Sequence, residues 1–287
     1  MNQSKPTLAA ACTAELIGTF LLIFLGCGAV NAAVAYGAQS GVWQVAIVWG
    51  IGVMLAVYAI GSISGAHLNP AITVAMAAWR GFPKSQVLPY IGSQVVGAFL
   101  AAAVLFFIFN AQLSEIERVK KVVRGEAGSE ITATAFCEFY PAPGGLAVGK
   151  EPYSAAEHAQ MRARVPHHVA FFAEVIGTMI LAIVVFAVSD ERNGGSPQLG
   201  TAPLFIGLTV AGLISVIGPV TQACLNPARD FGPRLFTAAA GWGTVVLPGA
   251  DGFSWLTVYI IAPIVGAVIG GGIQTYLIRP LYPVQKG

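Results

Sequence analysis

Residues 64–71 read Ser-Gly-Ala-His-Leu-Asn-Pro-Ala, and residues 225–229 read Leu-Asn-Pro-Ala-Arg. Each Asn-Pro-Ala triplet opens a short apolar segment, about 69–79 and 226–240, that is too short to cross a bilayer. Asn is a favoured N-cap and Pro is well tolerated at the first helical position, so both triplets predict helix starts. A single Asn-Pro would more often mark a surface turn. Two copies in similar apolar surroundings instead predict a pair of half-helices that begin inside a membrane.

Six longer apolar stretches flank these two segments, and each has roughly the length of ~20 residues that a transmembrane helix needs. The chain is 56% hydrophobic and only 10% charged, against ~25% charged in an ordinary soluble domain, so an integral membrane protein is indicated. The net charge of +2 and the scattered basic residues argue against a nucleic-acid partner. The six expected spans are roughly 9–34, 42–61, 87–109, 168–188, 202–219 and 254–278.

The two halves of the chain repeat the same order of span, span, short segment and span. Residues 13–19 (Thr-Ala-Glu-Leu-Ile-Gly-Thr) match residues 172–178 (Phe-Ala-Glu-Val-Ile-Gly-Thr). The number of residues between these two segments is nearly the same as the number between the two Asn-Pro-Ala triplets. Because two unrelated motifs recur at nearly the same separation, the sequence indicates an internal duplication. Because each half has three spans, the second half must insert in the opposite orientation, which predicts an inverted repeat whose broken segments meet at the midplane.

We therefore expect one channel domain over residues 1–287, with repeats at about 8–109 and 168–278 joined by a polar, loop-like segment at 110–167. Basic residues in the short connections fall on one side of this arrangement. The excess of Lys and Arg on the cytoplasmic side of membrane proteins places both termini in the cytoplasm, for a multi-pass protein of the plasma (inner) membrane. These basic residues are Lys5, Arg80, Lys84, Arg192, Arg279 and Lys286.

Two helix N-termini that meet head to head would make a site that favours neutral solutes. Their positive dipole ends repel cations, and the amides of Asn69 and Asn226 can donate hydrogen bonds to a passing oxygen. Extended backbone before each Asn would offer carbonyl acceptors, since irregular backbone at membrane depth is tolerated where it lines a polar cavity. The carbonyls expected to line the pore are those of Gly65, Ala66, His67, Gln222 and Cys224.

The paired motifs resemble the twin signatures of the aquaporin superfamily, the major intrinsic proteins. Asp230, Arg234, Pro263-Ile264 and the long segment before the fourth span are similar to the glycerol-facilitator branch. The resemblance implies an all-α membrane fold of six spans plus two re-entrant half-helices, a homotetramer with one pore per chain, and passive passage of glycerol, other small uncharged solutes and water. It assigns the pore motif to Asn69, Pro70, Ala71, Asn226, Pro227 and Ala228.

The same resemblance implies a selectivity filter made of Trp49, Ile214, Ala223 and Arg229. An Arg at membrane depth costs at least ~2.5 kcal/mol, so Arg229 should face water or a partner. Bacterial glycerol facilitators usually carry Gly and Phe where this chain has Ile214 and Ala223. The departure leaves open whether glycerol, urea, water or a metalloid hydroxide is preferred.

Glu15 and Glu174 are the acidic residues within the full spans. Intramembrane carboxylates can form a proton relay, but their symmetric placement favours another role, accepting hydrogen bonds from the N–H groups of the re-entrant segments. Inverted repeats also serve secondary active transporters, so that class remains an alternative, as does a structural membrane protein without conduction.

Enzymatic chemistry is not indicated. A nucleophile elbow, a phosphate-binding loop and a two-histidine metal motif are all missing from the sequence, and the four cysteines show no metal-ligand spacing. We expect no catalytic residue, no cofactor and no metal, and we expect the partners to be small solutes, the lipid bilayer and further copies of the chain.

Overall fold

The computed structural model describes residues 6–39, 41–194, 199–247 and 253–283. Over these residues the chain is helical and forms no strand. Six of the described helices are long and apolar enough to cross a membrane: α1 (Leu8–Tyr36), α2 (Val42–Ser64), α4 (Lys84–Lys120), α7 (His167–Val188), α8 (Ala202–Thr221) and a final stretch, Ser254–Leu281. The last stretch consists of α10 (Ser254–Leu256), η5 (Thr257–Ile261), α11 (Ala262–Ile273), η6 (Gln274–Ile278) and η7 (Arg279–Leu281).

Two shorter helices follow the Asn-Pro motifs. They are α3 (Pro70–Trp79) and α9 (Pro227–Thr237), each with its Asn as N-cap and its Pro in the first turn, as the sequence predicts. After α9 the chain continues through η3 (Ala238–Trp242) and η4 (Gly243–Val245).

The helix contacts repeat between the two halves. α1 packs on α4 and α2, while in the second half α7 packs on α11 and α8. Each half-helix also packs on the last span of the other half, α3 on α11 and α9 on α4. The halves meet along α2 and α8, where Gly50 and Gly207 allow the backbones to approach so closely that a Cβ at either residue would collide with the carbonyl oxygen of the other.

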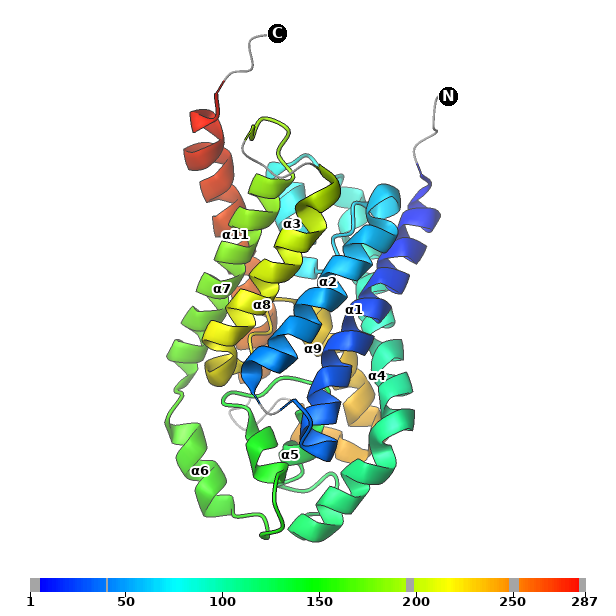
Figure 1. Ribbon diagram of the computed structural model, residues 1–287, viewed down its shortest axis with the longest axis vertical. Helices are drawn as coiled ribbons and strands as arrows, with labels where there is room; N and C mark the ends of the chain where they lie inside the picture. The colour runs from blue at the N-terminus through cyan, green and yellow to red at the C-terminus, as the bar shows by residue number, and fades with distance from the viewer. Residues whose placement is uncertain (1–5, 40, 195–198, 248–252, 284–287) are drawn as a thin grey trace.

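The segment at 110–166 differs from the expected loop. α4 runs to Lys120, well past residue 109, because Leu113, Ile116 and Glu117 continue a buried face at helical spacing. The rest contains α5 (Glu130–Ala133), η1 (Pro143–Ala147) and α6 (Ala155–Ala163). We call residues 110–166 the cap, because they gather at one end of the molecule, opposite the end where α1 begins and η7 finishes (Figure 1).

Candidate pore and selectivity filter

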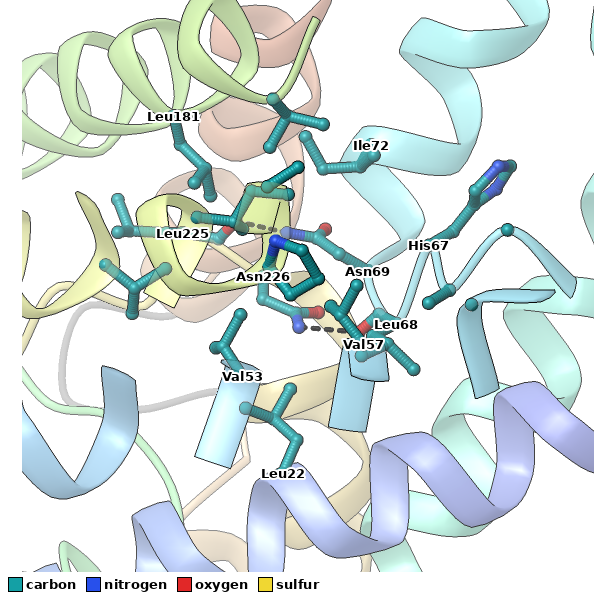
Figure 2. Close-up of a pocket in the computed structure, with 18 of the residues that line it drawn as sticks. Leu22, Val53, Val57, His67, Leu68, Asn69, Ile72, Leu181, Leu225 and Asn226 are labelled. Atoms are coloured by element: carbon teal, nitrogen blue, oxygen red, sulfur yellow. Dashed lines mark hydrogen bonds between the residues drawn. The ribbon is translucent and has the colours of Figure 1, made fainter. Parts of the chain in front are cut away.

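The two half-helices meet through their capping asparagines. The Oδ1 atom of Asn69 accepts from the backbone N–H of Ala71 at 2.8 Å, and that of Asn226 accepts from Ala228 at 3.0 Å. Each side-chain Nδ2 then donates across the junction, from Asn69 to Leu225 O and from Asn226 to Leu68 O, both at 2.8 Å (Figure 2). The reciprocal bonds bring the two helix starts together, as the inverted repeat requires.

A buried carboxylate supports each half-helix from behind. Glu15 accepts from the Ser64 hydroxyl and from the backbone N–H groups of His67 and Leu68 at 2.6–2.9 Å. Glu174 accepts in the same way from the Thr221 hydroxyl and from the N–H groups of Cys224 and Leu225, again at 2.6–2.9 Å. Neither carboxylate is exposed. Their oxygens are thus occupied by the orphan backbone donors ahead of each helix, an arrangement suited to structural support.

The backbone before each asparagine is not extended, so that part of the expectation is wrong. Ala66 and Leu68 in the first half, and Gln222, Ala223 and Leu225 in the second, have φ between 49° and 66°. A left-handed conformation costs non-glycine residues ~1–2 kcal/mol each. Hydrogen bonds offset this conformational free energy, because the turns direct consecutive N–H groups onto Glu15 and Glu174. The carbonyls between these N–H groups remain available to the cavity.

A cavity of about 370 Å³ passes the asparagine pair. It extends from Ser189 and Ala202, near the end of α7 and the start of α8, to Trp49 and Arg229. Its wall beside the asparagines is apolar, formed in Figure 2 by Leu22, Val53, Val57, Ile72 and Leu181. The passage therefore offers polar groups along one strip and hydrocarbon on the facing surfaces.

Most of the expected site residues border this cavity. They include Asn69 and Asn226, the four residues expected to form the filter (Trp49, Ile214, Ala223 and Arg229), and the backbone positions Gly65, Ala66, His67 and Cys224. Pro70, Ala71, Pro227 and Ala228 do not line it, because they are buried within the helix starts.

Gln222 is the exception among the five positions whose carbonyls were expected to line the pore, because it does not border the cavity. Its side-chain Oε1 accepts from Phe139 N at 2.7 Å and from Thr134 Oγ1 at 3.0 Å, both in the cap. Gln222 thus connects the approach to α9 with the cap.

Arg229 lies beside Trp49 at one end of the cavity and is 4% exposed. Its guanidinium carbon lies 4.4 Å from the centre of the Trp49 ring, within the range of a cation–π contact. Nη1 donates to Phe136 O at 3.0 Å, and Nε lies 2.5 Å from Oε1 of Glu138. Among the described residues no acceptor bonds to Nη2, which leaves these N–H groups for a solute.

Glu138 is the residue of this site that the sequence reading missed. It lies in the cap, far from Arg229 along the chain and outside any recognisable motif. Asp230 and Arg234 hold its backbone: Asp230 Oδ1 accepts from Glu138 N at 2.8 Å, and Arg234 Nη2 donates to Glu138 O at 2.5 Å. Asp230 and Arg234 are themselves an ion pair at 2.8 Å. An acidic residue in a polar segment gave no local signal that it would be buried.

Comparison with known proteins gives a consistent result. The sequence model of the major intrinsic protein family matches residues 2–274. The chain is 41% identical over 277 residues to the glycerol uptake facilitator protein of Pseudomonas aeruginosa, covering 96% of this chain and 91% of that protein. It is also 41% identical to the propanediol uptake facilitator PduF of Citrobacter freundii, covering 99% and 96%. The X-ray structure of the aquaglyceroporin from Plasmodium falciparum superposes with a TM-score of 0.78 at 24% identity, covering 96% of this chain and 99% of that one, which supports the same fold.

Proposed function

The chain belongs to the major intrinsic protein family, and from this we propose that it is a passive transmembrane channel for glycerol and related small uncharged solutes, including propanediol and water. The glycerol and propanediol facilitators that resemble it over nearly their whole length support this substrate class. The observation that carries the proposal is the head-to-head pair of half-helices, with Asn69 and Asn226 bordering one cavity.

The geometry supports a mechanism in which the solute exchanges its hydrogen bonds with water for hydrogen bonds with the pore. One N–H of each asparagine amide is fixed to the opposite half, and the second can donate to a solute hydroxyl. Backbone carbonyls of Ala66 and Cys224 can accept from the same hydroxyls, and the apolar wall can contact the carbon atoms. A cation meets two positive helix ends and recovers little of its hydration. The solute then moves down its gradient without chemical change and without a cofactor.

We propose that Trp49, Ile214, Ala223 and Arg229, which border one cavity, form its constriction and act as the selectivity filter. Trp49 supplies a flat apolar wall, and Arg229 supplies hydrogen-bond donors and a positive charge. Ala223 presents only a methyl group, so the filter has more room than one with a second aromatic ring. This leaves urea and metalloid hydroxides as competing solutes to test.

Resemblance to the family supports a proposal about assembly, and the basic residues of the short connections support one about orientation. We propose a homotetramer with an independent pore in each chain, in the plasma (inner) membrane with both termini cytoplasmic. The exposed apolar side chains on the outer helices, such as Phe107 at 90% and Val216 at 74% exposure, suit contact with lipid or with another copy.

Stopped-flow light scattering of proteoliposomes tests the function. Vesicles challenged with sucrose should shrink, and those challenged with glycerol or 1,2-propanediol should re-swell quickly without any ion gradient. A secondary active transporter would instead show saturable, ion-dependent uptake. The hydrogen bonds that occupy Glu15 and Glu174 argue against their use as coupling-ion ligands. Vesicles that respond no faster than protein-free ones would refute conduction.

A further inference from the structure

The cap inserts a carboxylate directly behind the filter. Glu138 is 1% exposed and belongs to a buried run from Ile131 to Glu138. Its backbone is fixed on both sides by the Asp230–Arg234 pair, so the side chain is held in place before it meets Arg229. A side chain fixed in this way can orient a flexible neighbour.

The guanidinium of Arg229 is oriented by four contacts. Trp49 covers one face, Phe136 O and Cys27 Sγ accept from Nη1 at 3.0 and 3.5 Å, and Glu138 Oε1 lies at Nε. Neither Glu138 oxygen has an aligned hydrogen-bond donor among the described residues, so its hold on Arg229 is mainly that of opposite charge. With Nε and Nη1 engaged, Nη2 is left for the cavity.

Without that negative charge, Arg229 would be a buried cation with a neutral carbonyl and an aromatic face as its main partners. A buried cation without a counter-ion is unfavourable and moves toward water when it can. The accessible water is in the pore, so the guanidinium would shift into the aperture and narrow it.

We propose that Glu138 is a positioning residue of the filter: its carboxylate holds Arg229 back against Trp49 and so keeps the aperture open for a three-carbon polyol. The proposal rests on the channel function above and adds a specificity determinant from the cap. Its consequence is that the ratio of glycerol to water permeability depends on the charge at residue 138, since water needs less width than glycerol.

The charge of Glu138 can vary with pH. Burial raises the pKa of Glu138 to about 8, although the Arg229 guanidinium pulls it down and Asp230 raises it further. Below this pKa the carboxyl is neutral and the ion pair is lost, and above it the pair is restored. Other titratable or charged groups around Glu138 are Cys27 from α1, Cys137 from the cap, Glu174 from α7, Cys224 before α9, Asp230 and Arg234 from α9, Tyr259 from η5, and His158 and Arg162 from α6.

Glu138 borders a second, small cavity, which lies between the cap and the neighbouring helices and is separate from the main cavity. This small cavity has a volume of about 30 Å³, is lined by Glu138, Trp255, His158 and Arg162 among others, and shares no lining residue with the main cavity. That volume admits a water molecule. Trp255 Nε1 and both Glu138 oxygens lack other hydrogen-bond partners among the described residues, so a water there can bridge them and carry a proton.

The test measures glycerol and water permeability of the same proteoliposomes from about pH 6 to about pH 9.5, a range that spans the transition. For the wild-type chain we expect the glycerol-to-water ratio to rise by roughly threefold to tenfold with a midpoint near the pKa of Glu138, because a polar interaction changes at the constriction. Glu138→Gln should give a pH-independent ratio at the low-pH value of the wild type. Glu117→Gln is the matched control: Glu117 is also a largely buried cap carboxylate, paired with Arg124 at 3.0 Å, but it does not border the main cavity. It should keep the wild-type profile.

Two results would overturn the proposal. One is a wild-type ratio that does not change with pH, which needs no variant and so does not depend on how well Glu138→Gln folds. The other is a Glu138→Gln profile that follows the wild type. Wild-type vesicles that conduct neither solute would refute the channel function instead, which keeps the two failures distinct.

Discussion

Ala223 borders the same cavity as Trp49 and Arg229, and the size of its side chain should set how much room remains beside Arg229. It borders the cavity with a single methyl group and is 4% exposed, while Trp49 forms the aromatic wall. Its φ of 58° is held by the bonds from Cys224 and Leu225 to Glu174, so the position of its Cβ is set by the backbone. A substitution at residue 223 should therefore change the width of the pore beside Arg229 and leave the rest of the pore nearly unchanged.

We predict that Ala223→Phe increases selectivity for glycerol over bulkier polyols. The added ring narrows the aperture and gives the carbon face of glycerol a second apolar surface, while a five-carbon polyol loses the room it needs. The ratio of glycerol to ribitol permeability should rise by about tenfold, the equivalent of ~1.4 kcal/mol in barrier height. Light scattering on matched proteoliposomes measures it, with water permeability as the internal control. An unchanged ratio would remove Ala223 from the filter.

Asn69 and Asn226 could be placed at the cavity because their positions follow from a local motif, whereas Trp49 and Ile214 could be placed there only through the family resemblance. Asn69 and Asn226 cap helices, and capping is a property of a few consecutive residues. Gln222 and Glu138 could not be placed in this way, because their positions depend on contacts between the cap and the approach to α9. Nothing within either segment indicates which of its polar side chains turns inward.

The half-helices depend on their supporting carboxylates. Glu174 accepts from three donors next to α9, and the equivalent bonds of Glu15 support α3. Without an acceptor, backbone N–H groups buried at membrane depth are left unpaired. The left-handed residues before each asparagine would then lose the contacts that compensate for their strain.

We predict that Glu174→Ala destabilises the protein strongly, since each buried donor left unpaired costs ~1–3 kcal/mol. Glu174→Gln keeps one acceptor oxygen and should lose less. Thermal unfolding in detergent, followed by tryptophan fluorescence, measures both, with Glu15→Ala expected to match Glu174→Ala. If Glu174→Gln kept full stability but stopped transport, a proton-relay role would be favoured over structural support.

The contact of α7 with α11 depends on glycine. A Cβ on Gly270 would collide with the backbone carbonyl oxygen of Met179, and backbone cannot move aside as a flexible side chain can. We predict that Gly270→Ala separates the two helices and costs ~1–3 kcal/mol of stability, typical of overpacking. Gly212 in α8 has open space at its Cβ, so Gly212→Ala is the matched control and should be neutral. Equal melting temperatures for the two variants would contradict the close approach.

The spans could be predicted because an apolar run of the right length has few alternatives in a chain of this composition. The end of α4 could not, because Glu115, Glu117 and Arg118 end the apolar run while the helix continues. The helix persists beyond the apolar run because the cap packs against it: Glu117 accepts from Thr132 Oγ1 at 2.7 Å and pairs with Arg124. Hydropathy identifies the membrane-spanning part of a helix and gives no information about how far the helix continues outside the membrane.

The two ends of the molecule are built differently. At one end the cap contacts Arg229 through Phe136 and Glu138. At the other end Asp190 pairs with Arg80 after α3 at 3.2 Å and with Arg279 near the C-terminal end at 2.8 Å. The side of the membrane that the cap faces therefore decides which solution Arg229 and Glu138 meet first.

We predict that the cap faces the outside of the cell. Lys84 and Lys150 are both exposed, the first at the start of α4 and the second in the cap. In intact cells a membrane-impermeant thiol reagent should label Lys150→Cys and spare Lys84→Cys, and disrupted cells should show labelling of both. All chains in this experiment carry Cys12→Ser, because Cys12 is partly exposed, and the chain without a Lys→Cys change gives the background, since Cys27, Cys137 and Cys224 are buried. Labelling of Lys84→Cys alone in intact cells would invert the orientation. Glu138 would then respond to cytoplasmic pH, and the basic residues near the termini would lie outside, against the positive-inside rule.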